Sequence, residues 1–204
     1  MVSVNDTKLI VQNIVCGNQI VVKGQYPSTV ESILTIFTSF IPSNCVSNFG
    51  YRDCYEHCYL CKFLGLPLDV HVPTSAQILV LNLMSVMEHP RELSCFRLDV
   101  RQVSELHKPM NPLPQIVDEI TDLIGLSKTQ ESETYTTALA AVIQRWSSKS
   151  LSYILAMKTM EDPTSNEEKL FSILQVGEND VLMLRFFNGD LKLNERNRLL
   201  KEVQ

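Results

Sequence analysis

Hydrophobic and polar positions alternate along the chain at two spacings, and each spacing predicts a type of element. Two runs rich in Val and Ile, at 8–16 and 19–23, flank the dipeptide Gly-Asn at 17–18. This arrangement predicts a β-hairpin, because glycine accepts the positive φ that a tight turn demands. After it, the capping-box pattern S-T-V-E at 28–31 and apolar residues three to four positions apart predict a helix that ends near Phe40.

The middle of the chain is predicted to add two strands and a buried helix. Residues 66–72 would form a short strand whose alternate apolar side chains share one face. Residues 74–88 carry apolar side chains all round a helical axis, which is typical of a central buried helix. Residues 93–103 alternate between apolar and charged positions, and this alternation indicates a half-exposed strand.

Three prolines between 109 and 114 separate this mixed region from a helical one. Proline fixes φ and lacks an N–H donor, so 109–114 is predicted to be an extended connector. Beyond it the apolar pattern predicts a strand at 181–187 and helices at 116–124, 134–159, 166–176 and 191–203. The predicted fold is α+β and predominantly helical. Residues 1–108 are predicted to form a mixed region with an N-terminal β-hairpin, short strands and helices. The connector at 109–114 leads to a mainly helical region, residues 115–204, which we expect to pack against residues 1–108 as one unit.

The composition is that of a folded globular chain, with 45% apolar and 20% charged residues in a length of 204. A net charge of −5 argues against a large phosphate-binding surface. Residues 1–25 lack the basic start and unbroken apolar run of a secretory signal, and no apolar run approaches the roughly 20 residues that cross a bilayer. We therefore expect an intracellular, cytoplasmic protein without a membrane span, and leave a nuclear location open.

Four of the six cysteines lie within residues 45–61, together with one histidine. Two of these cysteines have the C-x2-C spacing that is usual for two thiolates on one zinc ion. The other two would complete a tetrahedron across the intervening loop. The predicted structural zinc site therefore comprises Cys45, Cys54, Cys58 and Cys61, with His57 or His71 as substitutes for one of them.

A second interpretation treats these cysteines as buried thiols. Cys54, Cys58 and Cys61 would share one face of a helix, and reduced cysteine is among the most buried residue types. In a regular helix Cys54 and Cys61 would lie about 10 Å apart along the axis. Sulfurs on one zinc ion lie only about 3.8 Å apart. The zinc interpretation therefore requires an irregular backbone at this point.

An enzymatic role has little support in the motifs. A cysteine hydrolase would need a thiolate activated by a neighbouring base, and the candidate bases are His57, His71, His89 and His107. The sequence has no C-x5-R loop after these cysteines, no G-x-S-x-G elbow, no P-loop and no H-E-x-x-H. No catalytic residue is therefore predicted.

These observations predict an intracellular, non-enzymatic protein-interaction or regulatory protein with a structural zinc clasp and a protein partner. The alternatives are a cysteine-nucleophile hydrolase and a zinc-dependent nucleic-acid-binding protein. Nucleic acid is the less favoured ligand, because Arg52 and Lys62 are the cluster's cations and Asp53 and Glu56 stand beside them. A homo-oligomer is left open. One Cys/His cluster without a catalytic motif is also typical of viral accessory proteins.

Overall fold

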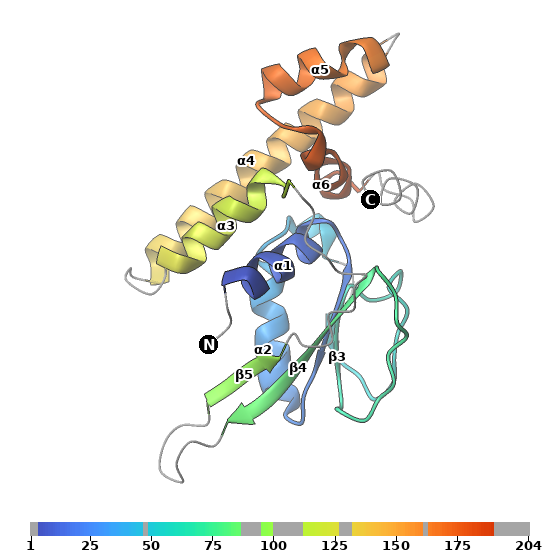
Figure 1. Cartoon of the computed structure of the whole chain (residues 1–204), viewed down its shortest axis with the longest axis vertical. Coiled ribbons are helices and arrows are strands. Elements are labelled where there is room, and N and C mark those ends of the chain that lie inside the picture. The colour runs from blue at the N-terminus through green and yellow to red at the C-terminus, as the bar shows by residue number, and fades with distance from the viewer. Residues whose placement is uncertain are drawn as a thin grey trace.

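A mixed sheet with two helices occupies one end of the molecule, and further helices occupy the other end (Figure 1). The computed structural model describes residues 4–46, 49–86, 95–99, 112–126, 132–160 and 163–189. We call α1, α2 and the sheet the sheet unit, and α3 to α6 the helical unit. The elements are, in chain order, α1 (Val4–Val15), β1 (Gln19–Lys23), α2 (Pro27–Thr38), η1 (Ser43–Cys45), β2 (Phe49–Tyr51), β3 (Phe63–Leu66), β4 (Ile78–Val86), β5 (Cys95–Asp99), α3 (Gln115–Leu126), α4 (Ser132–Thr159), α5 (Pro163–Leu174), η3 (Glu178–Asp180) and α6 (Val181–Phe187).

The sheet has the strand order β2-β3-β1-β4-β5. Strands β1 to β4 run parallel, and β5 is antiparallel to β4. Val21 at the centre of β1 lies opposite Leu64 of β3 and Val80 of β4. The prediction of an α+β fold with a helical C-terminal half is confirmed.

The two faces of the sheet are covered differently. Ile20 and Val22 point from β1 into a core that includes residues of α1 and α2, whereas Val21 points to the opposite face. On that opposite face the cover consists of the loops that follow β2 and β3, which contribute Tyr55 and Val70. Figure 1 shows α2 on one side of the sheet and these loops on the other.

Helix α2 lies close to the sheet because two glycines leave room for one of its side chains. A Cβ atom added at Gly24 or at Gly65 would come within 2.7 Å of a methyl group of Val30. Val30 is completely buried in this notch. Since real Cβ atoms do not approach so closely, both positions require glycine for the observed packing.

The predicted N-terminal hairpin is wrong, because residues 4–15 form helix α1. Gly17 does adopt a positive φ of 72°, but it joins a helix to β1 rather than one strand to another. The last seven residues of α1 are all buried between the sheet and the helical unit. Val and Ile are accepted in a helix there because tertiary burial outweighs their preference for strands.

The predicted buried helix at 74–88 is also wrong, because Ile78–Val86 form strand β4. A parallel strand that is covered on both faces has a continuous apolar sequence, and this pattern resembles that of a buried helix. The strand predicted at 66–72 is displaced: β3 is Phe63–Leu66, and the chain after it turns. The strand predicted at 93–103 is confirmed where it is described, as β5.

The predicted helical C-terminal half is confirmed by α3, α4 and α5. The strand predicted at 181–187 is wrong, because this segment is helix α6, whose apolar side chains pack against α4 and α1. Residues 112–114 are neither helix nor strand, which agrees with a connector, and 109–111 lie outside the described residues. The terminal helix predicted at 191–203 also lies outside them.

The capping box predicted at 28–31 does not form. Tyr26 is the N-cap residue of α2 and makes no side-chain cap hydrogen bond, and Pro27 occupies the first helical turn. Proline suits this position because its missing N–H would have no helical partner there. The Glu31 carboxylate instead accepts a hydrogen bond from the backbone N–H of Tyr51, at 3.4 Å.

The larger of the two hydrophobic clusters extends from the sheet unit into the helical unit. It includes Ile14 of α1, Ile120 of α3 and the completely buried Trp146 of α4. At the surface, Lys8 of α1 pairs with Asp118 of α3 at 2.6 Å. Within the described part of the chain no helix is both long and apolar enough to cross a membrane.

Candidate functional site

The cysteine-rich segment that the sequence singles out forms a loop over the sheet face opposite α2. We call residues 52–62, between β2 and β3, the cysteine loop. Because β2 and β3 are parallel neighbours, the chain must return along the whole length of the sheet to begin β3. The loop makes this return in turns and extended backbone, without a regular helix.

A buried glutamine fastens the cysteine loop to the sheet. Gln19, at the start of β1, donates from its amide nitrogen to the carbonyl oxygens of Glu56 at 2.8 Å and Cys61 at 2.7 Å. Its amide oxygen accepts from the hydroxyl of Tyr55 at 3.0 Å. The exposed fraction of Gln19 is 0%, so these bonds replace the water that the amide loses on folding.

Two cations fix the ends of the loop. Arg52 pairs with Glu56 at 3.1 Å where the loop begins. Lys62, where the loop ends, donates to the carbonyl oxygen of Gly17 at 2.7 Å and lies 5.7 Å from the centre of the Phe186 ring. Both cations are therefore engaged within the protein itself.

Cys45 lies apart from the cysteine loop, against the end of helix α6. Its thiol donates to the carbonyl oxygens of Phe186 at 3.4 Å and Phe187 at 3.5 Å, which belong to the last turn of that helix. Burial raises the pKa of the Cys45 thiol to about 11, and the nearby Lys62 opposes this shift. The thiol therefore stays protonated at neutral pH and acts as a hydrogen-bond donor.

The three cysteines of the loop have three different surroundings. Cys54 is exposed to solvent. Cys58 is buried, and its sulfur lies 3.5 Å from Nδ1 of His57. Cys61 is completely buried beneath the sheet and donates to the carbonyl oxygen of Phe63 at 3.3 Å. Burial is the largest cause that raises the pKa of Cys61.

The residues predicted to bind zinc do not form a tetrahedral set as they are placed here. Among the described residues, no three side chains of His, Cys, Asp or Glu come close enough together to hold a metal ion. His71, the predicted substitute, is exposed in the loop after β3. The irregular backbone that zinc requires is present, but the Cys45 and Cys61 thiols donate to separate carbonyl groups. The zinc site stays a prediction, which metal analysis of the purified protein would test.

Two of the four cysteines of the cluster have the opposite of the pKa shift that activates a nucleophile. The pKa of Cys45 and that of Cys61 are both raised by burial. A catalytic cysteine needs the opposite shift, since the thiolate is the reactive form. Cys58 does contact a histidine, but its side chain is only 3% exposed. This arrangement favours structural thiols over a hydrolase centre.

The outer side of the cysteine loop exposes large apolar groups. Tyr59 is 64% exposed and Leu60 is 50% exposed. The centre of the His57 ring lies 4.7 Å from that of Tyr59 and 6.4 Å from that of Tyr55. The loop thus presents aromatic and aliphatic surface outward while its buried side is hydrogen-bonded to the sheet.

Sequence reasoning missed the two residues that position this loop. Gln19 stands in the run Q-I-V-V-K, and an amide that begins an otherwise apolar buried strand could have indicated a buried hydrogen-bonding partner. Lys62 directly follows the last cysteine, but no local pattern links it to Gly17 or Phe186, which lie far away in sequence.

Comparison with known proteins identifies the family of the chain. Residues 1–198 match the model of the folliculin C-terminal domain. Folliculin of Xenopus tropicalis is 22% identical over 210 residues, which is 97% of this chain and 36% of the relative. The rat protein, from Rattus norvegicus, is 24% identical over 212 residues, and the human protein, from Homo sapiens, is 23% identical over 211, with the same two coverages. The chain thus spans about a third of the length of these relatives, and it belongs to the folliculin C-terminal domain family.

Proposed function

We propose that the chain is an intracellular, non-enzymatic regulatory protein that binds a partner protein through the cysteine loop. Its membership of the folliculin C-terminal domain family supports this class of function. The family gives no support to a viral accessory protein, since the matched relatives include frog and mammalian proteins. The raised pKa values of the Cys45 and Cys61 thiols speak against a hydrolase.

The observation that carries the proposal is the exposure of Tyr59 and Leu60 on a loop with a fixed base. Burial of a leucine or an aromatic side chain in an interface contributes roughly 1.5–3 kcal/mol. A flexible loop would lose part of this gain as it became ordered, whereas hydrogen bonds from Gln19 already hold the backbone of this loop. Tyrosine is also enriched in protein interfaces, where its ring and hydroxyl both find partners.

The same loop offers little to nucleic acid. Tyr59 could stack on a base, but a phosphate backbone also needs available cations. Arg52 is paired with Glu56, and Lys62 is bonded to the backbone of Gly17. A protein partner with an apolar surface suits this combination better.

Site-specific photocrosslinking tests the proposal. A benzoylphenylalanine residue in place of Tyr59 should give discrete crosslinked products in living cells that express the chain. Leu60→Ser in the same chain should abolish them, since the apolar contact beside the crosslinker is lost. The matched control carries the photoreactive residue at the exposed Ser148 of α4, and crosslinks to a second copy would identify a homo-oligomer. Equal yields from positions 59 and 148, or yields that Leu60→Ser leaves unchanged, would contradict the proposal.

A further inference from the structure

The carboxyl ends of β1, β2 and β3 meet at one edge of the sheet, at the end of the molecule away from the helical unit (Figure 1). In open sheets with parallel strands, ligands commonly bind beyond this edge, because the loops that leave it can carry chemistry without disturbing the core. Tyr59 and Leu60, the exposed residues of the cysteine loop, lie near the opposite end of the sheet, close to the start of β3. The carboxyl edge is therefore a separate surface.

Backbone hydrogen bonds hold the three strand ends in register. The N–H of Gly24, just after β1, donates to the carbonyl oxygen of Leu66 in β3 at 2.9 Å. The hydroxyl of Tyr51 in β2 donates to the carbonyl oxygen of Gly24 at 3.1 Å. The N–H of Arg52 donates to the carbonyl oxygen of Gly65 at 2.9 Å. The residues that follow these bonds therefore leave the sheet at the same edge.

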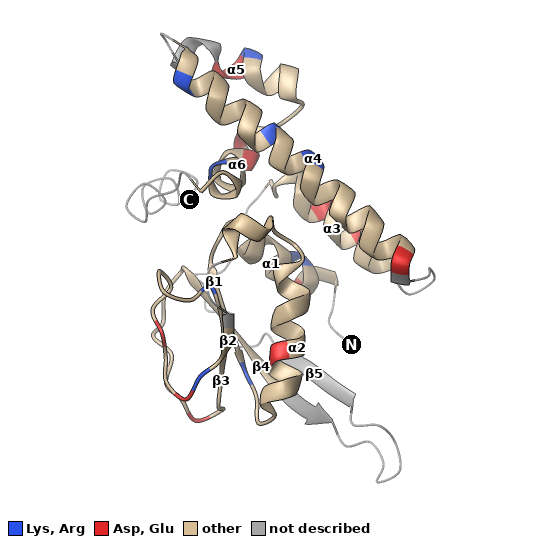
Figure 2. Ribbon diagram, turned by 180° about the vertical axis from the view of Figure 1, so that it is seen from behind, with Lys and Arg blue, Asp and Glu red and all other residues tan. Residues whose placement is uncertain are grey.

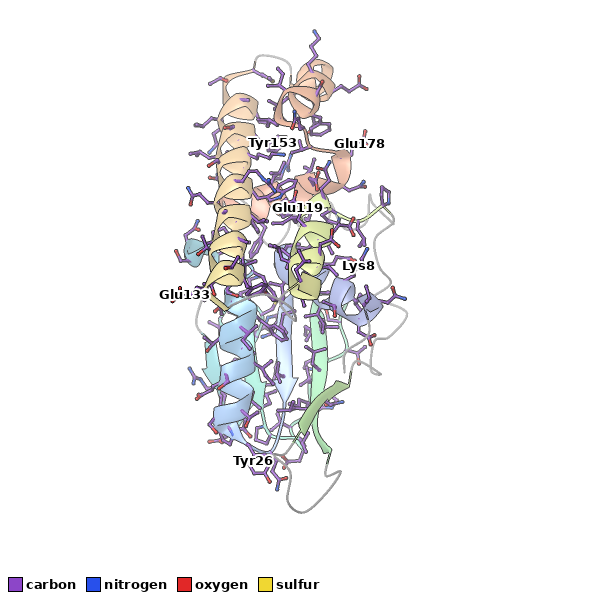
Figure 3. The ribbon with its side chains drawn as sticks, turned by 90° about the vertical axis from the view of Figure 1, so that its left-hand side faces the viewer. Lys8, Tyr26, Glu119, Glu133, Tyr153 and Glu178 are labelled. Atoms are coloured by element: carbon purple, nitrogen blue, oxygen red, sulfur yellow. The ribbon has the colours of Figure 1, made fainter. Side chains whose placement is uncertain are left out.

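Those residues combine apolar surface with negative charge. Tyr26 is 49% exposed and Leu68 is 50% exposed, and Figure 3 shows Tyr26 at the end of the molecule opposite Tyr153. Asp53 and Asp69 are exposed and come from the two neighbouring loops. Both carboxylates raise the pKa of Tyr51, although burial is the larger cause, which agrees with their placement beside the end of β2.

Among the described residues, no salt bridge joins a cation to the carboxylate of Asp53 or Asp69. Arg52 is already paired with Glu56, and Lys23 at the end of β1 is only partly exposed. Figure 2 shows both acidic and basic positions among the loops and strand ends on this side of the sheet. An anionic partner would be repelled here, whereas a cationic one would be attracted.

We propose that this edge binds a protein segment that presents a lysine or arginine beside an aliphatic side chain. The cation would lie between the carboxylates of Asp53 and Asp69, and the aliphatic group would cover Leu68 and the ring of Tyr26. Partly exposed charge pairs weaken with salt, so binding should be stronger at low ionic strength. This inference does not depend on the proposed role of Tyr59 and Leu60, because neither residue belongs to this edge; Asp53, at the start of the cysteine loop, is the residue that the loop contributes to it.

Selection from a random peptide library displayed on phage, with the whole chain as the target, tests this inference. The selected peptides should combine Lys or Arg with Leu, Ile or Phe. Their synthetic forms should bind the double variant Asp53→Asn, Asp69→Asn at least about tenfold more weakly, since two charge contacts are lost. Leu68→Ser should weaken binding as well. All these positions are exposed, so the variants should keep the circular dichroism and melting temperature of the parent chain.

Two control variants separate this surface from others. Asp122→Asn removes an exposed carboxylate from α3, and Tyr59→Ser removes the apolar contact of the cysteine loop. Neither should change the affinity of the selected peptides. The inference is overturned if the selected peptides are acidic, if the Asp53→Asn, Asp69→Asn variant binds them as well as the parent, or if the parent enriches no peptide over that variant. Loss of peptide binding in Tyr59→Ser alone would assign the peptides to the cysteine loop instead.

Discussion

Gln19 is a polar side chain on the central strand of the sheet, and none of its surface is exposed. Its amide nitrogen has two carbonyl partners in the cysteine loop, and its amide oxygen has the hydroxyl of Tyr55. The sequence suggested a metal ion as the fastening of this loop. In the structure, hydrogen bonds to one amide group connect the loop with the sheet.

We expect Gln19→Ala to reduce the free energy of unfolding by about 2–4 kcal/mol, because the buried carbonyl group of Cys61 and the partly buried one of Glu56 would lose their donor. Urea titration measures this loss. Alkylation of Cys58 in the native protein should also become faster, since the loop would open more often. Gln144→Ala, at an exposed position on α4, is the control and should change stability by less than about 0.5 kcal/mol. A Gln19→Ala protein with unchanged stability would show that the loop is held by other means.

Ionisation of the Cys45 thiol makes the stability of the protein depend on pH. Its pKa is about 11 in the folded protein, raised by burial from the ordinary value of 9.0. Between these two values the unfolded chain loses the proton while the folded protein keeps it. The contribution of this thiol to stability is therefore complete below about pH 9 and is lost as the pH rises to about 11.

Cys45→Ser tests this dependence, because the hydroxyl can still donate to the carbonyl oxygen of Phe186 but does not ionise in this range. The free energy of unfolding of the parent should fall more steeply between pH 9 and pH 11 than that of the variant. Urea titrations at several pH values measure both slopes. Cys61 is retained in both proteins, so its own raised pKa cancels in the comparison. Parallel pH profiles would mean that the Cys45 thiol is not protected in the folded state.

At the scale of elements, helices with a long apolar stripe could be predicted from the sequence, and elements buried all round could not. The stripes of α3 and α4 face one side, so their period identifies them. The second half of α1 is buried on every side and the strand β4 is apolar on both faces, so no clear period distinguishes helix from strand in either segment. In α6, seven residues give too few turns for a clear period.

Some features of the cysteine loop could be predicted from the sequence, and others could not. The sequence identifies the cysteine-rich segment and shows that zinc binding would require an irregular backbone there, but it does not predict that Tyr59 and Leu60 are exposed. The contacts of its cysteines could not be predicted, since the Cys45 thiol bonds to Phe186 and Phe187 on an element more than a hundred residues away. Spacing alone describes which ligands could meet, and the tertiary fold determines whether they do.

Helix α2 packs so closely on the sheet that adding one methyl group at Gly65 should destabilise the protein. In Gly65→Ala the new Cβ would meet Val30 at 2.7 Å and the backbone of Tyr51 at 3.3 Å, so the helix must shift. We expect a loss of about 1–3 kcal/mol in the free energy of unfolding. Adding Val30→Ala should recover part of this loss, because the two changes act on the same contact.

Gly125→Ala provides a control of opposite sign. A Cβ at Gly125 of α3 has no neighbour within 4 Å, and alanine favours a helix over glycine by up to about 1 kcal/mol. This variant should therefore be slightly more stable than the parent in the same urea titration. If Gly65→Ala were as stable as Gly125→Ala, the notch that receives Val30 would be less tight than the structure shows.

At the scale of the whole molecule, the sheet unit and the helical unit are joined through the end of α6. The ring of Phe186 lies against Gly17, where a Cβ would approach it to 2.5 Å, and Lys62 lies over the same ring. Cys45 and Asn44 donate to the carbonyl oxygens of the same helical turn. Together with the shared core, these contacts favour cooperative unfolding of the two units.

We therefore expect one unfolding transition when each unit is monitored by its own probe. Trp146, the single tryptophan, reports on the helical unit by fluorescence, and pulsed alkylation of the buried Cys16 reports on the sheet unit. Phe186→Ala should lower both midpoints together, with a loss of about 3–5 kcal/mol from the buried ring. Leu151→Ala, at a side chain 52% exposed on α4, should have little effect. If Phe186→Ala shifted the Trp146 transition and left the Cys16 transition unchanged, the two units would be independent, and α6 would not couple them.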